Sequence, residues 1–378
     1  MDNRLVSLEV ENFRSLRKIT LPLGPVTVLV GPNGAGKTNV LKVLEFLADI
    51  VRIDLAPALE EQGGFDEIVF RGGVEEPSTI QVKASFTTDE YELEVTKDGE
   101  ELRHAESFSF EGNRRIVVTD QGLVMGTGIA GEDSILGINT DTSGLSTLPR
   151  LQNEAGRKIG SIAKRLRSLK VFDVEVGAAR QPSLRTRRTE TLANDASNLA
   201  AYLFSMSRNN EAAWLQLVED ARSILPQLHS IDIVEPTESL REVSLVLIEE
   251  RMRLPTSLLE ASFGTVRMLG LLALLHDPTP PALTCLEEIE NGLHPQALEM
   301  LVERIREASD RTQFLIATHS PALLDRLYPD EFVVCERRAD GSSAIPAVST
   351  ERVRQIVAKS EDLPLGELWF SGALGGDL

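Results

Sequence analysis

One short segment of the chain has the residue types and spacing of a phosphate-binding loop. The stretch "GPNGAGKT", Gly31 to Thr38, fits the pattern G-x-x-x-x-G-K-[ST] in full. Glycines at this spacing let the backbone form a concave loop whose N–H groups point at phosphate oxygens, and a following helix adds its positive N-terminal end. The ammonium group of Lys37 would neutralise terminal phosphates, and the Thr38 hydroxyl would complete a Mg²⁺ shell. A chance glycine-rich turn is the alternative interpretation.

A second segment, "LTCLEEIENGLHP", places three carboxylates directly after a short apolar run. Ligands of open parallel sheets bind beyond the carboxyl ends of the strands, so acids in this position could act on a bound phosphate. Successive strand residues point in opposite directions, so Glu287 and Glu288 can serve different partners. We expect Glu287 to face Mg²⁺ and Glu288 to be the general base for an attacking water. An acidic helix start is the alternative.

The three carboxylates have different expected roles. The usual first acid of such a pair is Asp, and Glu287 is one methylene longer. We therefore expect Glu287 either to coordinate Mg²⁺ through a water molecule or to bind an ion whose position is slightly displaced. Glu290 is expected to shape the loop that leads to "NGLHP".

Strands and helices are predicted on both sides of the glycine-rich loop and of the acidic segment. The β-branched run "VTVLVG" predicts a strand, and the apolar spacing of residues 37–53 predicts a helix, so the glycine-rich loop stands between the two. Further along, the pattern predicts a strand at 282–287, a helix at 295–308 and a strand at 313–319. Strands that alternate with helices indicate a parallel sheet covered on both faces.

Other parts of the chain have different patterns. The alternating segment "RLVSLEVENFR" predicts a strand, and residues 78–127 predict an antiparallel meander with turns at "KDGE" and "DQG". Residues 155–225 are predicted to be mostly helical. No heptad pattern persists there for the three or four heptads that a coiled coil needs.

Composition excludes several protein classes. The 378 residues are 42% hydrophobic and contain no apolar run near the roughly 18 residues that cross a bilayer, so we expect a soluble protein without a membrane partner. The start of the sequence lacks the pattern of a signal peptide. Cys285 and Cys335 lie in apolar, strand-like runs, where a buried thiol is favoured over a disulfide. A cytoplasmic location is predicted.

The charge is unevenly distributed. A net charge of -19 argues against general attraction to nucleic acid, because like charges repel the phosphate backbone. Residues 150–188, however, contain eleven Lys or Arg and three acidic residues, a local excess of eight positive charges. A solvated helix face followed by a flexible basic loop explains this segment as well as a DNA-binding or partner-binding patch does. Both interpretations stay open.

Several motifs together resemble a known group. The segment "LEVENFRSLRKITLPLGPVTVLVGPNGAGKTNVLKVLEFL" resembles the opening of RecF/SMC-type ATP-binding cassette (ABC) ATPases, in which an N-F-R-S strand precedes the Walker A loop. "LEEIENGLHP" is similar to their Walker B motif and D-loop, with Ile289 in place of proline. "QFLIATHSPALLD" matches their switch-histidine segment. The tail "LGELWFSGALGGD" resembles stand-alone AAA_21 ATPases, relatives of the OLD family that lack its nuclease domain. The resemblance is weakest from 50 to 150.

The resemblance implies a fold and a domain organisation. We expect an α/β fold, a P-loop NTPase of the ABC (RecF/SMC-like) head type, with a mixed central sheet, an antiparallel β subdomain and a helical lobe. Residues 1–150 would form the ATP-binding lobe with Walker A and the β subdomain. Residues 151–260 would form a helical lobe with the basic segment. Residues 261–378 would carry the signature, Walker B, D-loop and switch histidine.

The family also has a signature loop that caps the γ phosphate held by the other subunit. Its closest match is "LLEASFGTVRML", with Ser262 and Gly264 in place and Phe263 where a small or acidic residue is more common. The serine hydroxyl and the following helix would donate to the phosphate. An ordinary helix N-cap is the alternative. The resemblance therefore implies ATP and Mg²⁺ held within an ATP-dependent homodimer.

The same resemblance implies the other residues around the nucleotide. His319 is expected on the γ-phosphate side, although a structural histidine at a strand end is possible from the sequence alone. His294 is expected to position the D-loop, and a Q-loop glutamine cannot be assigned between Gln62 and Gln81. For Arg14 a strand-end surface charge is the alternative. The expected nucleotide contacts are Asn33, Gly34, Gly36, Lys37, Thr38, Asn39, Arg14, Ser262 and Gly264.

Two functions fit these features. Both assume a Mg-dependent ATPase, which converts ATP to ADP and phosphate and dimerises around ATP. In the first, the dimer regulates a separate effector protein, such as a nuclease or toxin, in antiviral defence. In the alternative, a DNA repair or genome-maintenance ATPase acts directly on DNA through residues 150–188. The absence of a nuclease block after His319 predicts that the chain does not cut nucleic acid itself, and a transporter ATPase is disfavoured by the N-F-R-S and E-N-G-L-H-P segments.

Overall fold

The computed structural model describes most of the chain, which folds into two compact units. The described residues are 4–74, 76–111, 114–119, 123–127, 136–137, 142–186, 190–235, 242–360 and 363–375. Contacts divide the chain into a first unit of Met1–Leu169, Pro281–Cys285 and Leu315–Leu378, and a second unit of Lys170–Pro280 and Leu286–Phe314. Each unit is described by itself below.

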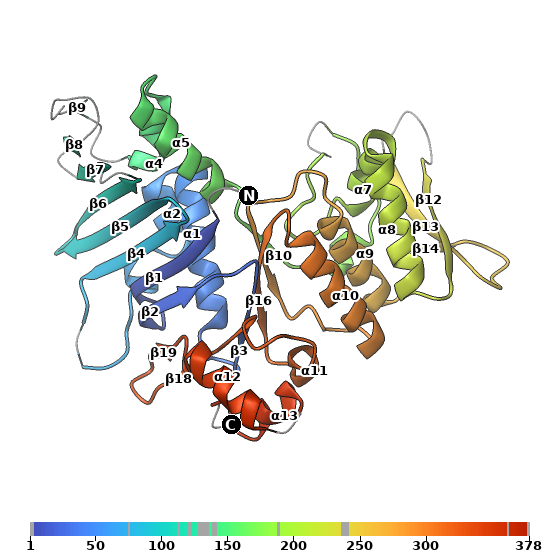
Figure 1. Cartoon of the computed structure of the whole chain (residues 1–378). Helices are drawn as coiled ribbons and strands as arrows, with labels where there is room; N and C mark the ends of the chain where they lie inside the picture. The colour runs from blue at the N-terminus through green and yellow to red at the C-terminus, as the bar shows by residue number, and fades with distance from the viewer. Residues whose placement is uncertain are drawn as a thin grey trace. The chain divides into compact units, whose positions relative to one another are not determined.

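An antiparallel sheet forms one layer of the first unit (Figure 1). Its strands follow the order β2-β1-β4-β5-β6-β7-β8-β9, and each neighbouring pair is antiparallel. This arrangement confirms the predicted meander. The strand bounds are β1 (Leu5–Phe13), β2 (Leu16–Pro22), β4 (Thr79–Phe86), β5 (Asp89–Asp98), β6 (Glu101–Phe110), β7 (Arg114–Thr119), β8 (Leu123–Thr127) and β9 (Leu136–Gly137).

The strand-like segments that predict the meander are "STIQVKASF", "EYELEVT", "RRIVVTD" and "GLVMG", and β6 is not among them. Its sequence, ELRHAESFSF, is mostly polar, and two positions that the fold buries are held by Glu106 and Ser107. A period-2 pattern detects a strand only when apolar residues occupy the buried face. The strand forms because β5 and β7 hydrogen-bond to its two edges, which is a tertiary effect.

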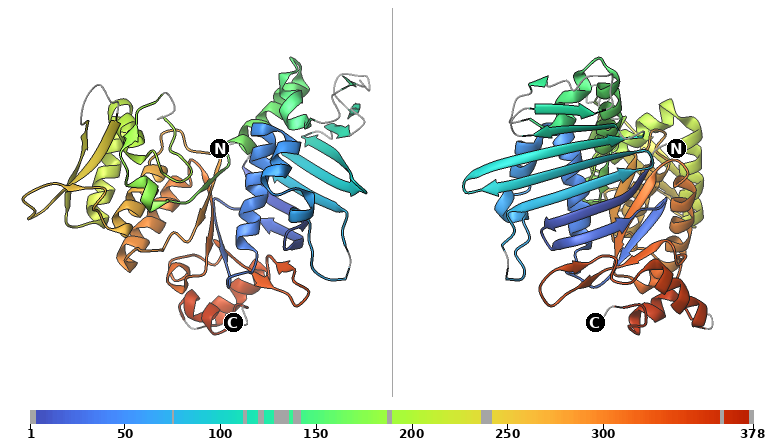
Figure 2. Two further views of the ribbon diagram at one scale, coloured as in Figure 1. Left: turned by 180° about the vertical axis from the view of Figure 1, so that it is seen from behind. Right: turned by 60° about the vertical axis from the view of Figure 1, so that its left-hand side comes forward.

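Helices cover one face of this sheet. Helix α1 occupies the predicted span, Lys37–Ile53, and its ring of Phe46 lies 6.0 Å from the ring of Phe13 on β1, measured between centroids. Both views in Figure 2 show α1 along the sheet, with α5 beside it. The short helices that follow α1 and the helix α5 have the bounds α2 (Leu55–Glu61), α3 (Phe65–Ile68), α4 (Gly144–Thr147), η1 (Leu148–Arg150) and α5 (Glu154–Arg167).

A second sheet of the first unit carries the loop segments of interest. Strand β3 (Val26–Val30) pairs in parallel with β17 (Phe332–Val334), and all five residues of β3 are buried. Burial on both faces is expected of a parallel strand covered by helices, so the predicted parallel pairing is confirmed here. Leu283–Cys285 of β15 and Leu315–Thr318 of β16 belong to the same unit. The remaining elements are β15 (Leu283–Glu287), β16 (Gln313–Thr318), α11 (Pro321–Leu324), β18 (Glu336–Arg337), β19 (Ser343–Ala344), α12 (Thr350–Lys359) and α13 (Leu365–Phe370).

The second unit combines helices with a small antiparallel sheet. Strands β11, β13 and β12 are neighbours in that order, and α7 and α8 pack against them (Figure 1). Of these three strands only the two-residue β11 lies within 155–225, the range expected to be mostly helical, whereas β12 and β13 follow it. Helix α9 is buried all round from Thr265 to Leu275, as its nearly unbroken apolar sequence predicts. The bounds are β10 (Lys170–Phe172), α6 (Val176–Ala179), β11 (Ser183–Leu184), α7 (Leu199–Asn209), α8 (Glu211–Ile224), β12 (Leu228–Val234), β13 (Glu242–Glu249), β14 (Thr256–Ser257), α9 (Phe263–Leu275) and α10 (Pro295–Ala308).

The structure contains no candidate for a membrane-spanning helix among the residues it describes. None of these helices combines the length and the apolar character that crossing a bilayer requires.

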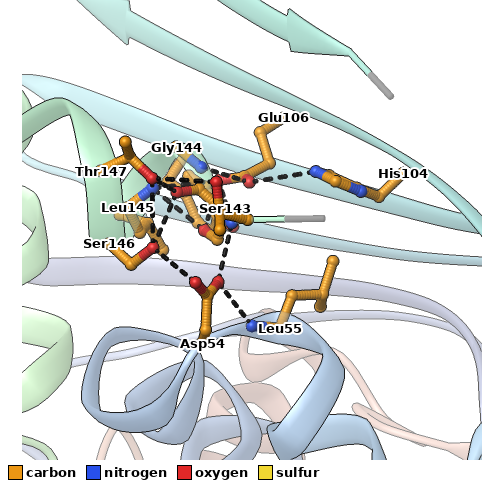
Figure 3. A network of polar contacts seen from close by, with 11 residues as sticks. Asp54, Leu55, His104, Glu106, Ser143, Gly144, Leu145, Ser146 and Thr147 are labelled. Carbon is orange, nitrogen blue, oxygen red and sulfur yellow. Dashed lines mark hydrogen bonds and ion pairs between the residues drawn. The ribbon is translucent and has the colours of Figure 1, made fainter. Parts of the chain in front are cut away.

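A buried carboxylate anchors the segment before α5 to the first sheet (Figure 3). The Glu106 side chain accepts hydrogen bonds from Gly144 N at 2.7 Å, from Ser143 Oγ at 3.0 Å and from the Tyr91 hydroxyl at 3.1 Å. The ring of His104 lies 3.8 Å from Glu106 Oε1. Burial raises the pKa of Glu106 to about 7, and the hydrogen bonds to Gly144, Ser143 and Tyr91 oppose this shift.

The raised pKa of Glu106 predicts a specific pH dependence of stability. A carboxyl group whose folded pKa exceeds its unfolded value stabilises the fold fully below the unfolded pKa, near 4.5, and this contribution is lost as the pH rises through about 7. The loss is on the order of 3 kcal/mol. Glu106→Gln keeps the volume of the side chain and cannot ionise. We therefore expect the variant to gain stability relative to the wild type between pH 5 and pH 7.5, as measured by urea unfolding.

A matched control is Glu101→Gln, which changes an exposed glutamate on the same strand. The unfolding free energy of this control should follow the wild type at both pH values. A Glu106→Gln variant that follows the wild type equally well would show that Glu106 stays ionised in the folded protein.

Candidate functional site

The predicted phosphate loop, Gly31–Thr38, adopts a backbone that requires its glycines. Gly34 and Gly36 have φ angles of 81° and 101°, a region that residues with a Cβ rarely adopt. A Cβ on Gly36 would lie 2.1 Å from Ser343 Oγ, and one on Gly31 would lie 2.1 Å from the carbonyl oxygen of Cys335. The pattern is therefore a structural requirement of this loop and not an accidental turn sequence.

Lys37 is buried at the point where the loop becomes a helix. It is the first residue of α1, and its Nζ donates hydrogen bonds to Gly31 O at 2.7 Å and to Pro32 O at 3.0 Å. The ammonium group thus lies within the curve of the loop. Thr38 and Asn33 are exposed beside it. The free N–H groups of a helix start and a buried cation together make a site suited to phosphate groups.

Two serines that sequence analysis did not select hold the loop in place. Asn39 Nδ2 donates to Ser15 Oγ at 2.7 Å, and Ser15 Oγ lies 2.7 Å from Ser343 Oγ. The amide of Ser343 also donates to the carbonyl of Ser15 at 2.8 Å. Ser15 belongs to the N-F-R-S segment, which could have drawn attention to it. The sequence around Ser343, "DGSSAIP", contains no comparable signal.

Arg14 and His319 also lie in the first unit. Arg14 has a φ of 51°, and its guanidinium donates to the side-chain oxygen of Gln62 at 3.1 Å and to the Gln62 carbonyl at 3.3 Å. The Arg14 side chain is thus held by Gln62, whereas a solvated charge at a strand end would have no protein partner. His319 follows the last residue of β16 and is exposed, as expected for a residue beyond the carboxyl end of a strand.

In the second unit, the carboxylates Glu287 and Glu288 have different environments. Glu287 ends β15, and its Oε1 is buried without a hydrogen-bond partner in the part of the chain that the structure describes. Glu288 has a φ of 45°, a strained value for a residue with a side chain, and its Oε2 accepts a hydrogen bond from Asn291 Nδ2 at 2.6 Å. The two adjacent carboxylates therefore lie in different environments, and the division of roles expected from the sequence stays a prediction.

Arg267 is a further residue of this site that sequence analysis missed. Its guanidinium donates to the backbone carbonyls of Glu287 and Glu288, each at 3.0 Å, and to Asp173 Oδ1 at 3.2 Å. Only 6% of the residue is exposed. These bonds hold the turn that carries both carboxylates. The available signal was a single cation within the apolar helix "TVRMLGLLALL", since charged residues are rarely buried without a partner.

The predicted signature segment packs against the predicted D-loop. Ser262 is the N-cap of α9, and its Oγ accepts a hydrogen bond from Thr265 N at 3.1 Å. A Cβ on Gly264 would lie 2.4 Å from the carbonyl oxygen of Gly292, so only glycine fits at this contact. The ring of Phe263 lies against Gly292 and is 50% exposed. Phe263 therefore supports the D-loop turn while Ser262 stays exposed.

The oxygen groups present fit a Mg²⁺ ion that is bound together with a nucleotide. Among the described residues, no group of three or more His, Cys, Asp or Glu side chains could hold a metal alone. Mg²⁺ usually keeps several waters and binds one or two protein groups together with substrate phosphates. In the first unit the Thr38 hydroxyl is a group of this kind. In the second unit, described by itself, the unpartnered Oε1 of Glu287 is another.

Relatives of this chain are found among curated proteins and solved structures. An OLD nuclease from Thermus scotoductus is 24% identical over 354 residues, which cover 85% of this chain and 60% of the relative. A DNA replication and repair protein RecF from an Anaeromyxobacter species (strain K) is 29% identical, over 54% of this chain and 57% of the relative. The chain thus spans somewhat more than half the length of these relatives.

Solved structures support the fold. An Smc head bound to the C-winged helix domain of ScpA superimposes with a TM-score of 0.57 at 15% identity, over 93% of this chain and 99% of that one. A second Smc head domain, with an extended coiled coil and a bound C-terminal domain of ScpA derived from Pyrococcus furiosus, gives a TM-score of 0.53 at 13% identity, over 95% of this chain and all of that one. At these identities the likeness concerns the fold alone. It confirms the predicted ABC head fold.

A family model matches most of the chain. The model is AAA_21, described as "AAA domain, putative AbiEii toxin, Type IV TA system", and it covers residues 26–325. That span contains the phosphate loop, the signature segment, the two carboxylates and the segment of His319. The chain therefore belongs to the AAA_21 family, with the fold of an ABC-type head and a sequence similar to those of OLD and RecF proteins.

Proposed function

We propose that the protein binds ATP together with Mg²⁺ and hydrolyses it to ADP and phosphate. The observation that carries this proposal is the phosphate loop itself, in which left-handed glycines surround a buried lysine at the start of α1. Release of phosphate from ATP and Mg²⁺ by the purified protein tests the proposal. An absence of both nucleotide binding and phosphate release would contradict it.

Each site residue has a proposed role. Lys37 and the backbone of the loop bind the β and γ phosphates, and Asn33, Gly34, Gly36 and Asn39 shape or line the same loop. Thr38 and Glu287 would hold Mg²⁺, and the ion would neutralise phosphate charge. Arg14 and His319 orient the phosphates from the ends of their strands. Arg267 positions the two carboxylates through their backbone.

Glu288 is the proposed general base. A water oxygen forms a bond to the γ phosphorus while the bond from that phosphorus to the bridging oxygen of ADP breaks. The water proton passes to the Glu288 carboxylate, whose Oε2 is oriented by the hydrogen bond from Asn291 Nδ2. The backbone carbonyl bonds from Arg267 keep the carboxylate in its position during this transfer.

The nucleotide site is proposed to be completed by dimerisation. Ser262 is exposed at the N-terminus of α9, a 13-residue helix whose first N–H groups can donate to an anion. In a homodimer, Ser262 and Gly264 of one subunit would cap the γ phosphate held by the other. ATP would then act as part of the subunit interface, so that hydrolysis separates the subunits.

Substitution of Ser262 tests this dimer. Ser262→Arg places a long cation at the exposed N-cap, so we expect the protein to bind ATP as a monomer and to lose ATP-dependent dimerisation, as measured by light scattering. Ser349→Arg is a matched control, because Ser349 is an exposed N-cap of α12 in the first unit. ATP-dependent dimers of the Ser262→Arg variant would contradict the proposed role of the signature segment.

The process that the ATPase serves is proposed to involve DNA. The relatives are named as an OLD nuclease and as a DNA replication and repair protein, and the family description names a toxin system. We favour antiviral defence, in which the dimer regulates a separate effector such as a nuclease or toxin. A repair ATPase that acts directly on DNA is the second candidate, and the charge distribution described next supports a direct DNA contact.

A further inference from the structure

The basic segment 150–188 divides into two parts with different environments. In its second part the cations are already engaged. Arg185 pairs with Glu235 at 3.0 Å, and buried Lys170 donates to Leu192 O at 2.5 Å, with its pKa lowered to about 8 mainly by burial. Arg187 and Arg188 lie outside the described residues. The first part, 150–167, contains the cations that remain exposed.

A groove of about 780 Å³ lies in the first unit beside these exposed cations. The C-terminal end of α1, the segment of α4 and η1, and one face of α5 form its walls. The residues that line it include Arg52, Asp54, Arg150, Lys164 and Arg167. The groove lies at the opposite end of α1 from Lys37, and a helix of 17 residues is roughly 25 Å long. The groove is therefore distinct from the phosphate loop.

The charge of the groove is positive and largely uncompensated. Arg52 pairs with Asp49 at 3.2 Å, but Arg150, Lys164 and Arg167 are exposed and have no carboxylate partner in the part of the chain that the structure describes. Three free cations thus gather in one groove of a protein whose net charge is -19.

Among the described residues that line the groove, Asp54 is the one carboxylate, and its oxygens already accept hydrogen bonds (Figure 3). Asp54 accepts hydrogen bonds from Leu55 N at 2.8 Å, from Ser143 N at 2.7 Å and from Ser146 Oγ at 3.0 Å. These three neutral donors hold the Asp54 carboxylate in place, and its one negative charge leaves the three cations of the groove in excess. Together with the bonds to Glu106, they also fix the wall of the groove in one conformation.

A second cavity, on another side of α5, has the charge composition of an ordinary solvated helix face. It has a volume of about 410 Å³ and contains Arg157 and Lys158, but three carboxylates line it as well: Asp89, Glu111 and Glu154. The pair Lys158–Glu154 is 3.8 Å apart. On this side of α5 the carboxylates outnumber the cations, whereas in the groove the cations outnumber the carboxylates. The solvated-face interpretation therefore explains Arg157 and Lys158 but not the groove.

We propose that the groove binds the phosphate backbone of DNA. The proposal rests on the DNA-related process proposed above and gives that process a contact site. The three cations are exposed, so a small anion would stay largely hydrated, whereas a polyanion gains affinity from the release of counterions at each contact. Two of the three are arginines, whose guanidinium groups can bind a phosphate through two hydrogen bonds. Backbone contacts of this kind position DNA without reading its sequence.

Charge reversal in the groove tests the proposal. Arg150→Glu combined with Lys164→Glu should weaken binding of fluorescent duplex or single-stranded DNA by about tenfold or more at low salt. The slope of log affinity against log salt should fall by about 2. Sequence changes in the DNA should not alter the effect. ATP hydrolysis without DNA should match the wild type, because neither residue belongs to the nucleotide site.

Control variants distinguish the effect of the groove charges on DNA affinity from the effect of the overall charge of the protein. Arg251→Glu combined with Arg253→Glu reverses two exposed arginines of the second unit and should leave DNA affinity within about twofold of the wild type. Arg150→Gln with Lys164→Gln removes the charges without adding acids and should give a smaller loss in the same direction. Thermal unfolding of each variant checks that it is folded.

The possible outcomes distinguish this proposal from the proposed function. If the wild type binds DNA and the groove variants bind it equally well, the groove proposal is overturned and the DNA role stands. If the wild type does not bind DNA at low salt, with or without ATP, both the groove and the direct DNA role fail while the ATPase stands. If polyglutamate of equal charge displaces DNA as well as DNA itself does, the groove takes acidic peptides and the proposal is overturned.

Discussion

Replacement of Lys37 by alanine should reduce ATP turnover by at least about a hundredfold. Lys37 is buried at the start of α1, and its ammonium group lies 2.7 Å and 3.0 Å from two carbonyl oxygens of the loop. Lys37 is the one Lys or Arg within the loop sequence Gly31–Thr38, so the variant loses the cation that lies within the curve of the loop. The measurement is phosphate release together with binding of a fluorescent ATP analogue.

The matched control for this experiment is Lys42→Ala. Lys42 lies five residues further along the same helix and pairs with Glu45 at 2.7 Å on the surface. Loss of this pair should cost about 1 kcal/mol or less and leave turnover unchanged. Wild-type turnover in the Lys37→Ala variant would show that the loop is not the nucleotide site. A fall in both variants would point to damage to α1.

Glu288→Gln should retain ATP binding and lower hydrolysis by about 10²-fold to 10⁴-fold, because an amide cannot accept the proton of the attacking water. The substitution keeps an oxygen or nitrogen within reach of Asn291 and leaves the carbonyl bond to Arg267 intact. The loop should therefore keep its shape. If hydrolysis separates the subunits, the variant should also accumulate as an ATP-bound dimer.

Single-turnover hydrolysis and size-exclusion chromatography with ATP measure the two effects of Glu288→Gln. Glu303→Gln, an exposed glutamate on α10, is the control and should behave as the wild type. Hydrolysis at the wild-type rate in Glu288→Gln would assign the base to another residue. Slow hydrolysis without dimers would keep the base and contradict the proposed link between hydrolysis and dissociation.

The local elements of the fold follow closely from the sequence. Helix α1 spans the predicted residues 37–53, and the strand before it is buried along its full length. Both are specified by short-range features, the apolar period of a helix and a continuous β-branched run. The meander is also predicted from short-range features, namely strand-like segments separated by turn signals. Strand β6 was missed because Glu106 occupies a buried position that an apolar residue usually holds.

The residues that support the candidate site could not be predicted in the same way. Ser15 and Ser343 are 328 positions apart and meet behind the phosphate loop. Arg267 reaches the carbonyls of Glu287 and Glu288 from a helix that is otherwise almost entirely apolar. These residues matter because of hydrogen bonds between positions far apart in the chain. Such bonds produce no periodic pattern or fixed spacing that a single sequence could reveal.

The sequence by itself determined which residues can do chemistry. Glycines that need left-handed angles, a lysine that begins a helix and acids that end a strand are local requirements, so they are visible in a few consecutive residues. Only the tertiary structure decided which charges are free. Eleven cations between 150 and 188 look alike in the sequence, but burial and partners engage Lys170 and Arg185 and leave Arg150, Lys164 and Arg167 exposed in one groove. The physical reason is that the effect of a charge depends on its neighbours in space, which the fold brings together.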